Sequence, residues 1–474
     1  MSGEIGPAQP LADRRERVVP WLVACALFME NLDSAIIATA LPAIATALDE
    51  DPVELSLAIT SYLLSLAVFI PVSGWMADRF GGRMVFRAAI VVFMVGSIAC
   101  GLATSLESLV LARVLQGAGG AMMVPVGRLV LLRAVPKSRL LRAMAFVTIP
   151  GLIGPVIGPP LGGLIATYAS WRWIFFINVP IALLGVVLVS VLIGNEREAA
   201  PRPLDARGFV LTGLALVGLL FGLQGLGRAV VPGGVTAALI VGGAVAAGLY
   251  VVHARSLAHP IIDLALLRIP TFRAAIVGGL FFRISIGAIP LLLPMMLQLG
   301  FGLTPFASGA ITFAGAAGAL TMKVAAAPIL RAVGFRRALL FNSVVSGVLL
   351  IGYGLFEPTT PHLVIVAVLL VGGFFRSLQF TALNTLCYAD AAPEQMSRAT
   401  SLVSVAQQVS QGVGVGLAAV LLHLTLALRG SEALDADAFD VSYLTIGALS
   451  FAAILFFRRL APDAGAEISG HRAR

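Results

Sequence analysis

Charged residues are scarce in this sequence. Only 12% of the 474 residues are Asp, Glu, Lys or Arg, whereas 59% are hydrophobic and the mean hydropathy is +0.97. Soluble domains contain about 25% charged and roughly 45–50% apolar residues. The composition therefore excludes an ordinary soluble protein and indicates an integral membrane protein.

Cysteine, lysine and histidine are also rare, and their positions exclude several kinds of site. The three cysteines, Cys25, Cys100 and Cys387, lie in apolar runs without the spacing of a disulfide or metal site. Neither lysine, Lys137 nor Lys323, follows the glycine-rich loop of a nucleotide-binding site. The histidines form no cluster. We therefore expect no metal, no cofactor and no enzymatic activity, and an energy source other than nucleotide hydrolysis.

Long apolar runs recur along the chain. About 20 apolar residues cross a bilayer as a helix, and these runs lack the alternation of membrane-barrel strands. The predicted fold is an all-α membrane protein with 14 transmembrane helices. They are expected near 20–47, 55–77, 84–105, 107–132, 140–166, 173–194, 208–229, 233–253, 272–298, 305–330, 338–356, 361–388, 399–427 and 440–457.

The arginines between these runs predict the orientation. With both termini in the cytoplasm, nearly all of them lie on the inner side, and only Arg172, Arg228 and Arg429 lie outside. Such an asymmetry is typical of multi-pass proteins of a bacterial-type inner membrane. It also accounts for most of the net charge of +8, so nucleic-acid binding is not needed to explain that charge.

A weak internal repeat divides the chain. At an offset of about 253 residues, LFME at 27–30 falls on LFFR at 280–283, and Arg79 and Gly82 fall on Arg331 and Gly334. Both copies begin on the same side, as in transporters built from parallel repeats. We expect a tail (1–19), a six-helix half (20–194), a linker (195–207), two extra central helices (208–255), an amphipathic linker (256–271), a second six-helix half (272–457) and a tail (458–474).

Away from their ends, the apolar runs contain only two acidic residues. Glu30 and Asp33 are three positions apart in the first run, which places both on one face of a helix. A carboxylate in hydrocarbon costs several kcal/mol unless it faces a partner or water, and it usually marks a functional site. Two such groups one turn apart resist double ionisation and titrate together. The alternative is that they snorkel or cap a helix.

Five motifs carry a resemblance to a known family. GWMADRFGGRMVF at 74–86, ARVLQGAGGAMMVP at 112–125 and GLIGPVIGPPLGG at 151–163 resemble the loop-2/3, fourth-helix and fifth-helix motifs of the major facilitator superfamily. ENLDSAIIATALP at 30–42 and WRWIFFINVP at 171–180 are similar to motifs of its 14-helix drug:proton antiporter family. The resemblance covers essentially the whole chain and implies proton-driven efflux of amphipathic small molecules, usually drugs.

The resemblance also implies roles for individual residues. Asp33 matches the first-helix motif as the main proton carrier, Arg113 influences its protonation, and Glu30 departs from the family's usual neutral residue. A conformational latch is expected at Gly74, Asp78, Arg79, Gly82 and Arg83, where the alternative is a loop that only sets topology. A hinge packed on a neighbouring helix is expected at Gly154, Pro155, Gly158, Pro159, Gly162 and Gly163, where the alternative is a merely distorted helix.

The remaining polar residues of the apolar runs are candidates for a substrate cavity. They are Arg283, Arg376, Gln116, Gln379, Gln407 and Gln411, and the alternative is that they only bond neighbouring helices. Arg283 falls on Glu30 in the repeat, so we hypothesise an ion pair between these two across the halves.

The charges of the apolar runs leave the substrate class open. Five basic residues, Arg113, Arg128, Arg283, Lys323 and Arg376, face only two acids. Such a balance favours an anionic metabolite or a metal chelate as an alternative cargo, and a sensor or scaffold that does not transport is a second alternative. The expected partners are a small-molecule substrate, protons and the lipid bilayer, with neither a nucleic acid nor an obligate protein partner.

Overall fold

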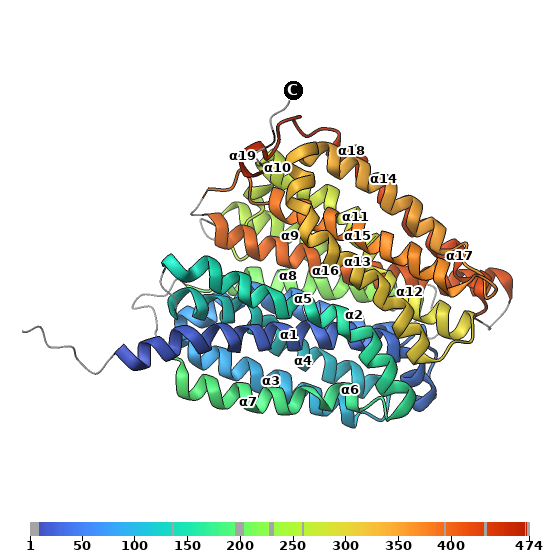
Figure 1. Cartoon of the computed structure of the whole chain (residues 1–474), viewed down its shortest axis with the longest axis horizontal. Coiled ribbons are helices and arrows are strands. Elements are labelled where there is room, and N and C mark those ends of the chain that lie inside the picture. Colours follow the sequence, from blue (N-terminus) through green and yellow to red (C-terminus); the bar gives the residue numbers. More distant parts are fainter. Residues whose placement is uncertain are drawn as a thin grey trace, which may run out of the picture.

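The computed structural model describes residues 9–134, 137–194, 203–226, 232–257, 260–392, 395–430, 434–469 and 471. These residues form α, 3-10 and π helices joined by short loops, with no strand among them (Figure 1). Within the described residues, thirteen helical segments are long and apolar enough to cross a membrane. The 32-residue helix α5 (Lys137–Tyr168) occupies the place of the expected fifth span. The prediction of an all-α protein with fourteen spans is confirmed.

The N-terminal half contains the first six spans. Its helices are α1 (Gln9–Leu48), α2 (Ser56–Phe80), α3 (Gly82–Leu102), α4 (Leu106–Ala134), α5, α6 (Trp173–Phe176) and α7 (Asn178–Leu192). Helix α1 packs along α5, and α4 packs on both α2 and α3.

The C-terminal half repeats this plan with one difference. Its first span, Pro270–Gly300, is divided into α10 (Pro270–Arg273), the π turn η2 (Ala274–Gly278), α11 (Gly279–Gly287), α12 (Ile289–Met295) and the π turn η3 (Met296–Gly300). The other spans are α13 (Pro305–Val333), α14 (Phe335–Tyr353), α15 (His362–Leu386), α16 (Met396–Arg429) and the segment of η5 (Ala436–Ala438), α17 (Asp440–Ala452) and α18 (Ile454–Phe457). The short helices η1 (Leu264–Arg268) and α19 (Ala466–Ser469) flank this half.

The loops between the second and third helix of each half share their geometry. Gly81 and Gly334 both have positive φ, 93° and 79°, a conformation that suits glycine. Two residues later, Arg83 donates to the backbone oxygen of Ser190, and Arg336 donates to the backbone oxygen of Arg458. An offset of 253 therefore pairs Gly334 with Gly81 and not with Gly82, because the turn requires the positive φ at that position.

The two halves meet along two equivalent seams. Helix α5 packs on α13, and α2 packs on α16, so the second and fifth helices of one half face the fifth and second of the other. Polar contacts join the halves as well: Gln298 Nε2 donates to the backbone oxygen of Thr39 at 2.9 Å, and the Phe306 N–H donates to Thr167 Oγ1 at 3.0 Å.

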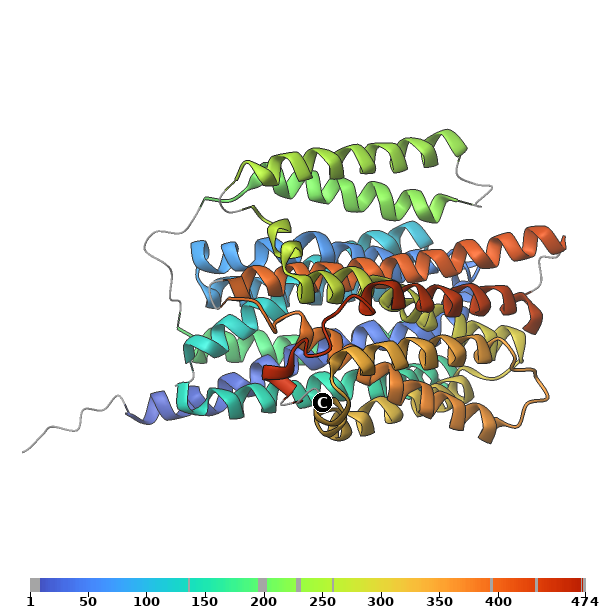
Figure 2. The ribbon, with the colours of Figure 1, turned by 90° about the horizontal axis from the view of Figure 1, so that it is seen from above.

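The two extra helices form a hairpin beside this bundle. Helices α8 (Ala206–Gly225) and α9 (Gly233–Arg255) pack closely on each other, and α8 contacts both α2 and α16 (Figure 2). Gly218 and Gly243 allow this approach, since a Cβ on Gly218 would lie 2.6 Å from the backbone oxygen of Leu239. The hairpin therefore lies against one of the two seams between the halves.

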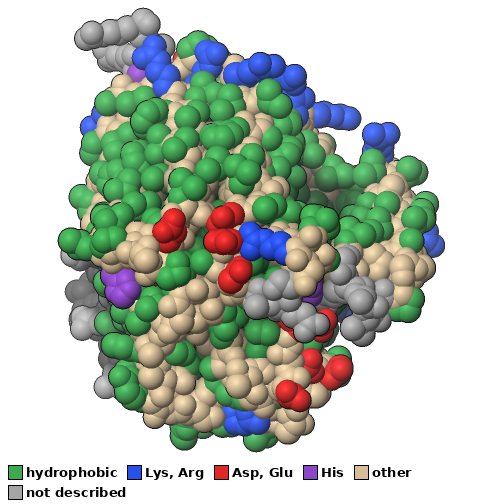
Figure 3. Space-filling view, turned by 90° about the vertical axis from the view of Figure 1, so that its right-hand side faces the viewer, with side chains coloured by type: hydrophobic (Ala, Val, Ile, Leu, Met, Phe, Trp, Pro, Cys, Tyr) green, Lys and Arg blue, Asp and Glu red, His purple; other side chains and the backbone are tan. Residues whose placement is uncertain are grey.

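The two ends of the bundle differ in charge. The end that we call the acidic end holds Asp49, Asp51, Glu54, Glu107, Glu357, Asp435 and Asp437, and acidic side chains are prominent on it in Figure 3. The opposite basic end holds Arg79, Arg83, Arg87, Arg268, Arg331, Arg336, Arg458 and Arg459. The bonds from Gln298 and Phe306 lie toward the acidic end, so the halves are joined there.

Candidate functional site

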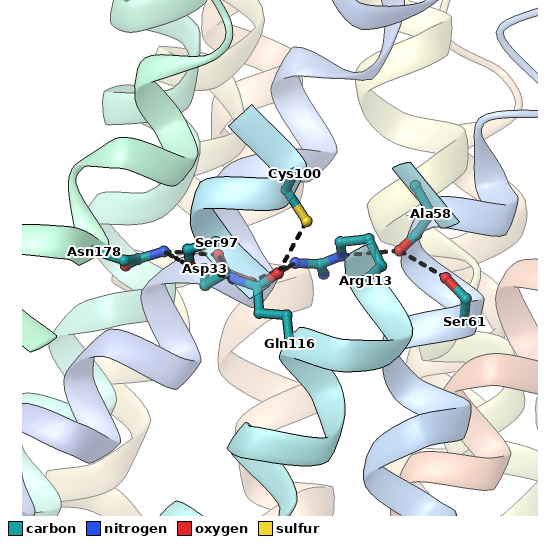
Figure 4. A network of polar contacts seen from close by, with 8 residues as sticks. All are labelled: Asp33, Ala58, Ser61, Ser97, Cys100, Arg113, Gln116 and Asn178. Atoms are coloured by element: carbon teal, nitrogen blue, oxygen red, sulfur yellow. Dashed lines mark hydrogen bonds and ion pairs between the residues drawn. The ribbon is translucent and has the colours of Figure 1, made fainter. Parts of the chain in front are cut away.

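Asp33 lies at the centre of the N-terminal half and is only 1% exposed. Its Oδ2 accepts from Arg113 Nη1 at 2.6 Å, which makes a buried ion pair. Its Oδ1 accepts from Gln116 Nε2 at 2.8 Å and from Asn178 Nδ2 at 2.9 Å. Figure 4 shows these side chains converging from α1, α4 and α7. The arrangement supplies the partners that a carboxylate in a membrane interior needs.

Arg113 is fully buried, and several groups surround its guanidinium. Besides Asp33, Nη1 donates to Gln116 Oε1 at 2.6 Å, and Nε donates to the backbone oxygen of Ala58 at 3.0 Å. The guanidinium also lies 4.1 Å from the centroid of the Tyr62 ring, a cation–π contact. Arg113 thus connects the acid of α1 to the backbone of α2.

A ring of small polar groups completes this network. Ser97 Oγ accepts from Gln116 Nε2 at 2.7 Å and from Asn178 Nδ2 at 3.3 Å. Cys100 Sγ lies 3.6 Å from Gln116 Oε1. Sequence reasoning did not identify Ser97 or Asn178 as site residues. Asn178 belongs to the WRWIFFINVP motif, which was a usable signal, whereas no pattern distinguishes Ser97 from other serines of the spans.

Glu30, one turn before Asp33, lies in a different environment. It is half-buried, and its Oε2 has no hydrogen-bond partner among the described residues. Arg128 of α4 attracts this carboxylate electrostatically, and Asp33 repels it. The hypothesised ion pair with Arg283 is absent from this conformation, because that guanidinium is held inside the C-terminal half.

The bonds of Arg283 explain why it does not reach Glu30. Nη1 donates to the backbone oxygen of Ala275 at 3.3 Å, in the π turn η2, and Nη2 donates to Asn384 Oδ1 at 3.4 Å. The side chain is 0% exposed, so Arg283 does not line an open cavity here.

Arg376 lies in the middle of α15. Over the described residues, its guanidinium makes neither an ion pair nor a hydrogen bond. It lines a small cavity with Ile286, Ser346 and Tyr353. It therefore fits the expected cavity position, although the space is narrow.

The four candidate glutamines separate into two groups. Gln116 and Gln379 are 0% exposed, and each bonds inside its own half. Gln379 Nε2 donates to Ser343 Oγ at 3.1 Å, as Gln116 Nε2 does to Ser97. In this conformation both amides hold neighbouring helices together, and their assignment to a substrate cavity stays a prediction. Gln407 and Gln411 are half-buried on α16 and stay candidates.

The latch residues lie at the basic end, between α2 and α3. Arg83 bonds to α7 of its own half, and Gly82 lies against α4, where a Cβ would meet Val130 at 3.0 Å. Gly74, in contrast, has open space beside it. Asp78 and Arg79 also lie at this end, at the last turn of α2. The geometry agrees with a structured loop, and the switching role stays a prediction.

The expected hinge is a continuous helix packed tightly on α1. Helix α5 contains four prolines and runs without a break from Lys137 to Tyr168. A Cβ on Gly154 would lie 2.9 Å from the backbone nitrogen of Leu32, and one on Gly158 would lie 2.6 Å from the Cβ of Ala35. These glycines and Gly162 therefore allow α5 and α1 to approach closely. Gly163 lies instead against the start of α13, and bending at Pro155 and Pro159 stays a prediction.

Comparison with known proteins agrees with this architecture. The family model that matches is described as Major Facilitator Superfamily, over residues 23–415 and 275–473. The "Putative multidrug resistance protein MdtD" of Salmonella heidelberg is 39% identical over 412 residues, which covers 85% of this chain and 86% of the relative. The corresponding protein of Salmonella paratyphi A has the same identity and coverage.

A solved structure shares the fold at low identity. The structure of the D-xylose-proton symporter superposes with a TM-score of 0.66 at 15% identity, and the match covers 94% of this chain and 98% of that one. Both the sequence relatives and this structural neighbour are described as resistance or transport proteins. The chain therefore belongs to the major facilitator superfamily and, within it, to the transporters of the multidrug efflux type.

Proposed function

We propose that this protein exports amphipathic small molecules in exchange for protons. The observation that carries the proposal is the buried ion pair of Asp33 and Arg113, whose Oδ2 and Nη1 atoms lie 2.6 Å apart. A structural helix contact does not need an ionisable pair, whereas a proton carrier needs a carboxylate whose environment changes between two states.

The residues around Asp33 suggest how a proton is taken up. While Arg113 lies against the carboxylate, Coulomb attraction favours the ionised form. A shift of α4 relative to α1 that separates the two would leave a bare carboxylate, which then takes a proton. Gln116 and Asn178 hold Oδ1 and keep the side chain in place during the exchange. Glu30, whose Oε2 has no hydrogen-bond partner in the described part of the chain, is proposed as the acid through which the proton enters or leaves.

Alternating access is proposed to occur by rocking of the halves. The halves are joined near the acidic end through Gln298 and Thr39, and through Phe306 and Thr167. With the basic end in the cytoplasm, these contacts join the halves toward the outer side, and transport requires them to break. The loop from Gly74 to Arg83 and the glycines of α5 are the proposed latch and hinge.

A second candidate cargo is an organic anion or an anionic metal chelate. It is favoured by the C-terminal half, where the helices α11, α12, α14 and α15 contain Arg283 and Arg376 but no Asp or Glu. A carboxylate on the substrate would complement these charges.

The experiment is substrate-induced proton release from the purified protein in proteoliposomes with a pH-sensitive dye. We expect a proton flux when ethidium, a lipophilic cation, is added. A flux with benzoate and none with ethidium would support the second cargo. An absence of flux with a panel of cations and anions would reject proton-coupled transport and leave a sensor or scaffold.

A further inference from the structure

A small cavity inside the C-terminal half has the chemistry of an anion site. Its walls come from Ile286 of α11, Ile289 of α12, Ser346 and Tyr353 of α14, and Arg376 of α15. The cavity has room for about one water-sized group. It lies away from the Asp33 network, which is built entirely from helices of the other half.

Arg376 supplies a positive charge that no described residue balances with an ion pair. Its guanidinium makes no ion pair and no hydrogen bond in the described part of the chain. None of the four elements that build the cavity, α11, α12, α14 and α15, contains an Asp or Glu. A guanidinium inside a membrane protein normally has such a partner, because an unpaired charge is costly there.

The cavity offers a second free donor. Ser346 is only 4% exposed, and its Oγ has no hydrogen-bond partner among the described residues. The Tyr353 hydroxyl lies against Gly372, where any Cβ would collide with it. The other walls are aliphatic, so the cavity presents donors and a positive charge but no carboxylate.

The N-terminal half has a carboxylate beside its arginine, which the Arg376 cavity lacks. There the arginine of the RVLQ sequence, Arg113, pairs with Asp33. In the C-terminal half the similar RSLQ sequence stands 263 residues after RVLQ, and its Arg376 lies beside Ile286, which is 253 residues after Asp33. That offset is the one that pairs the two positive-φ glycines of the loops. An isoleucine thus stands where the other half has its carboxylate.

We propose that the Arg376 cavity binds a single small anionic group, a carboxylate oxygen of the transported molecule or a free halide ion. Arg376 pairs with the charge, and Ser346 donates a second hydrogen bond. If the group is a carboxylate of the substrate, the cavity is part of the substrate site of the export function proposed above, and the inference then rests on that function. If the group is a halide ion, its binding does not depend on transport.

Thermal unfolding of the purified full chain tests this proposal without transport. The probes are benzoate, its neutral isostere benzamide, and chloride added to a chloride-free sulfate buffer. We expect benzoate or chloride to raise the unfolding temperature in a saturable manner, and benzamide to have no effect. A response to benzoate alone identifies a carboxylate site, and a response to chloride alone identifies a halide site.

Four variants connect the response to the cavity. Arg376→Gln should weaken the apparent affinity at least about tenfold, since a charge-assisted bond is lost. Lys323→Gln, which removes a positive charge from α13 of the same half, should leave it unchanged. Ile286→Asp should abolish the response by pairing with Arg376 internally, whereas the neutral Ile286→Asn should keep it.

The outcomes also separate this site from proton coupling. A response that persists in Arg376→Gln, or no response to either anion in the unsubstituted protein, overturns the anion site. An anion response without any proton flux in proteoliposomes leaves the site intact and rejects the export function alone.

Discussion

Arg113 and Arg376 belong to similar sequences, RVLQ and RSLQ, on the fourth helix of each half, yet their surroundings are opposite. Arg113 bonds to Asp33, Gln116 and the backbone of Ala58, and it stacks on an aromatic ring. Arg376 has neither a hydrogen bond nor an ion pair in the described part of the chain. The difference suggests a division of labour, in which the N-terminal half binds the coupling proton and the C-terminal half binds the substrate.

The first spans of the two halves also differ, because one is a continuous helix and the other is interrupted. Helix α1 is a single helix of 40 residues, locked against α5 by close glycine contacts. Its counterpart, Pro270–Gly300, contains two π turns, one of which gives Arg283 a backbone acceptor at Ala275. Because π turns often occur at functional sites, the interrupted helix is a better candidate for rearrangement than the continuous one.

The largest expected effect on stability comes from breaking the ion pair of Asp33 and Arg113. Arg113→Gln leaves the Asp33 carboxylate buried without a counter-charge, which should cost about 3–5 kcal/mol of unfolding free energy. Thermal or denaturant unfolding in detergent measures it. In Asp33→Asn combined with Arg113→Gln the loss should be smaller than the sum of the single losses, because no charge is stranded. Additive losses would mean that the two residues do not act as a pair.

A smaller effect, on transport, is expected from substituting Glu30, which is not part of the ion pair of Asp33 and Arg113. Glu30→Gln should keep transport but alter its pH dependence or substrate range, with rate changes of no more than about tenfold, or about 1.4 kcal/mol. Transport rates across a pH series, with ethidium as cargo, provide the measurement. Complete loss of transport in Glu30→Gln, with transport retained in Asp33→Asn, would make Glu30 the main proton carrier.

The smallest effect on stability is expected for the unsatisfied arginine. Arg376→Gln removes a charge that has no anionic partner, so the unfolding free energy without added anion should change by no more than about 1 kcal/mol. The same unfolding assay that is used for Arg113→Gln gives a direct contrast. Equal losses for the two arginines would show that Arg376 has a partner of its own, and the contrast between the halves would fail.

The fold followed from two signals in the sequence, the strong one of apolar length and the weaker one of the internal repeat. Apolar length predicted the spans, and the repeat around Arg79 and Gly334 placed the halves within one residue of the observed equivalence. The two extra helices were also placed correctly. Their position beside α2 and α16 was not predictable, since the arginines of α8 and α9, Arg207 and Arg255, lie only in the first and last turns of the hairpin.

The site was only partly predictable. Asp33 and Arg113 were identified, because an acid and a guanidinium in hydrocarbon each need a partner. The bonds of Gln116 to Asp33 and Ser97 were not predictable, since helical spacing gives the face of a residue but not the helix that covers that face. The expected pair of Glu30 and Arg283 rested on the repeat alone, and the repeat gives equivalent positions in the halves without giving the distance between them.

Proton release by Asp33→Asn in proteoliposomes tests the central claim most directly. Asp49→Asn is the matched control, since it removes a carboxylate directly after the end of α1, the helix that carries Asp33. Asparagine tolerates the φ of 56° at this position. The account predicts that Asp33→Asn lowers substrate-induced proton release by at least about 100-fold, while Asp49→Asn behaves like the unsubstituted protein. Normal proton release in Asp33→Asn would contradict the account.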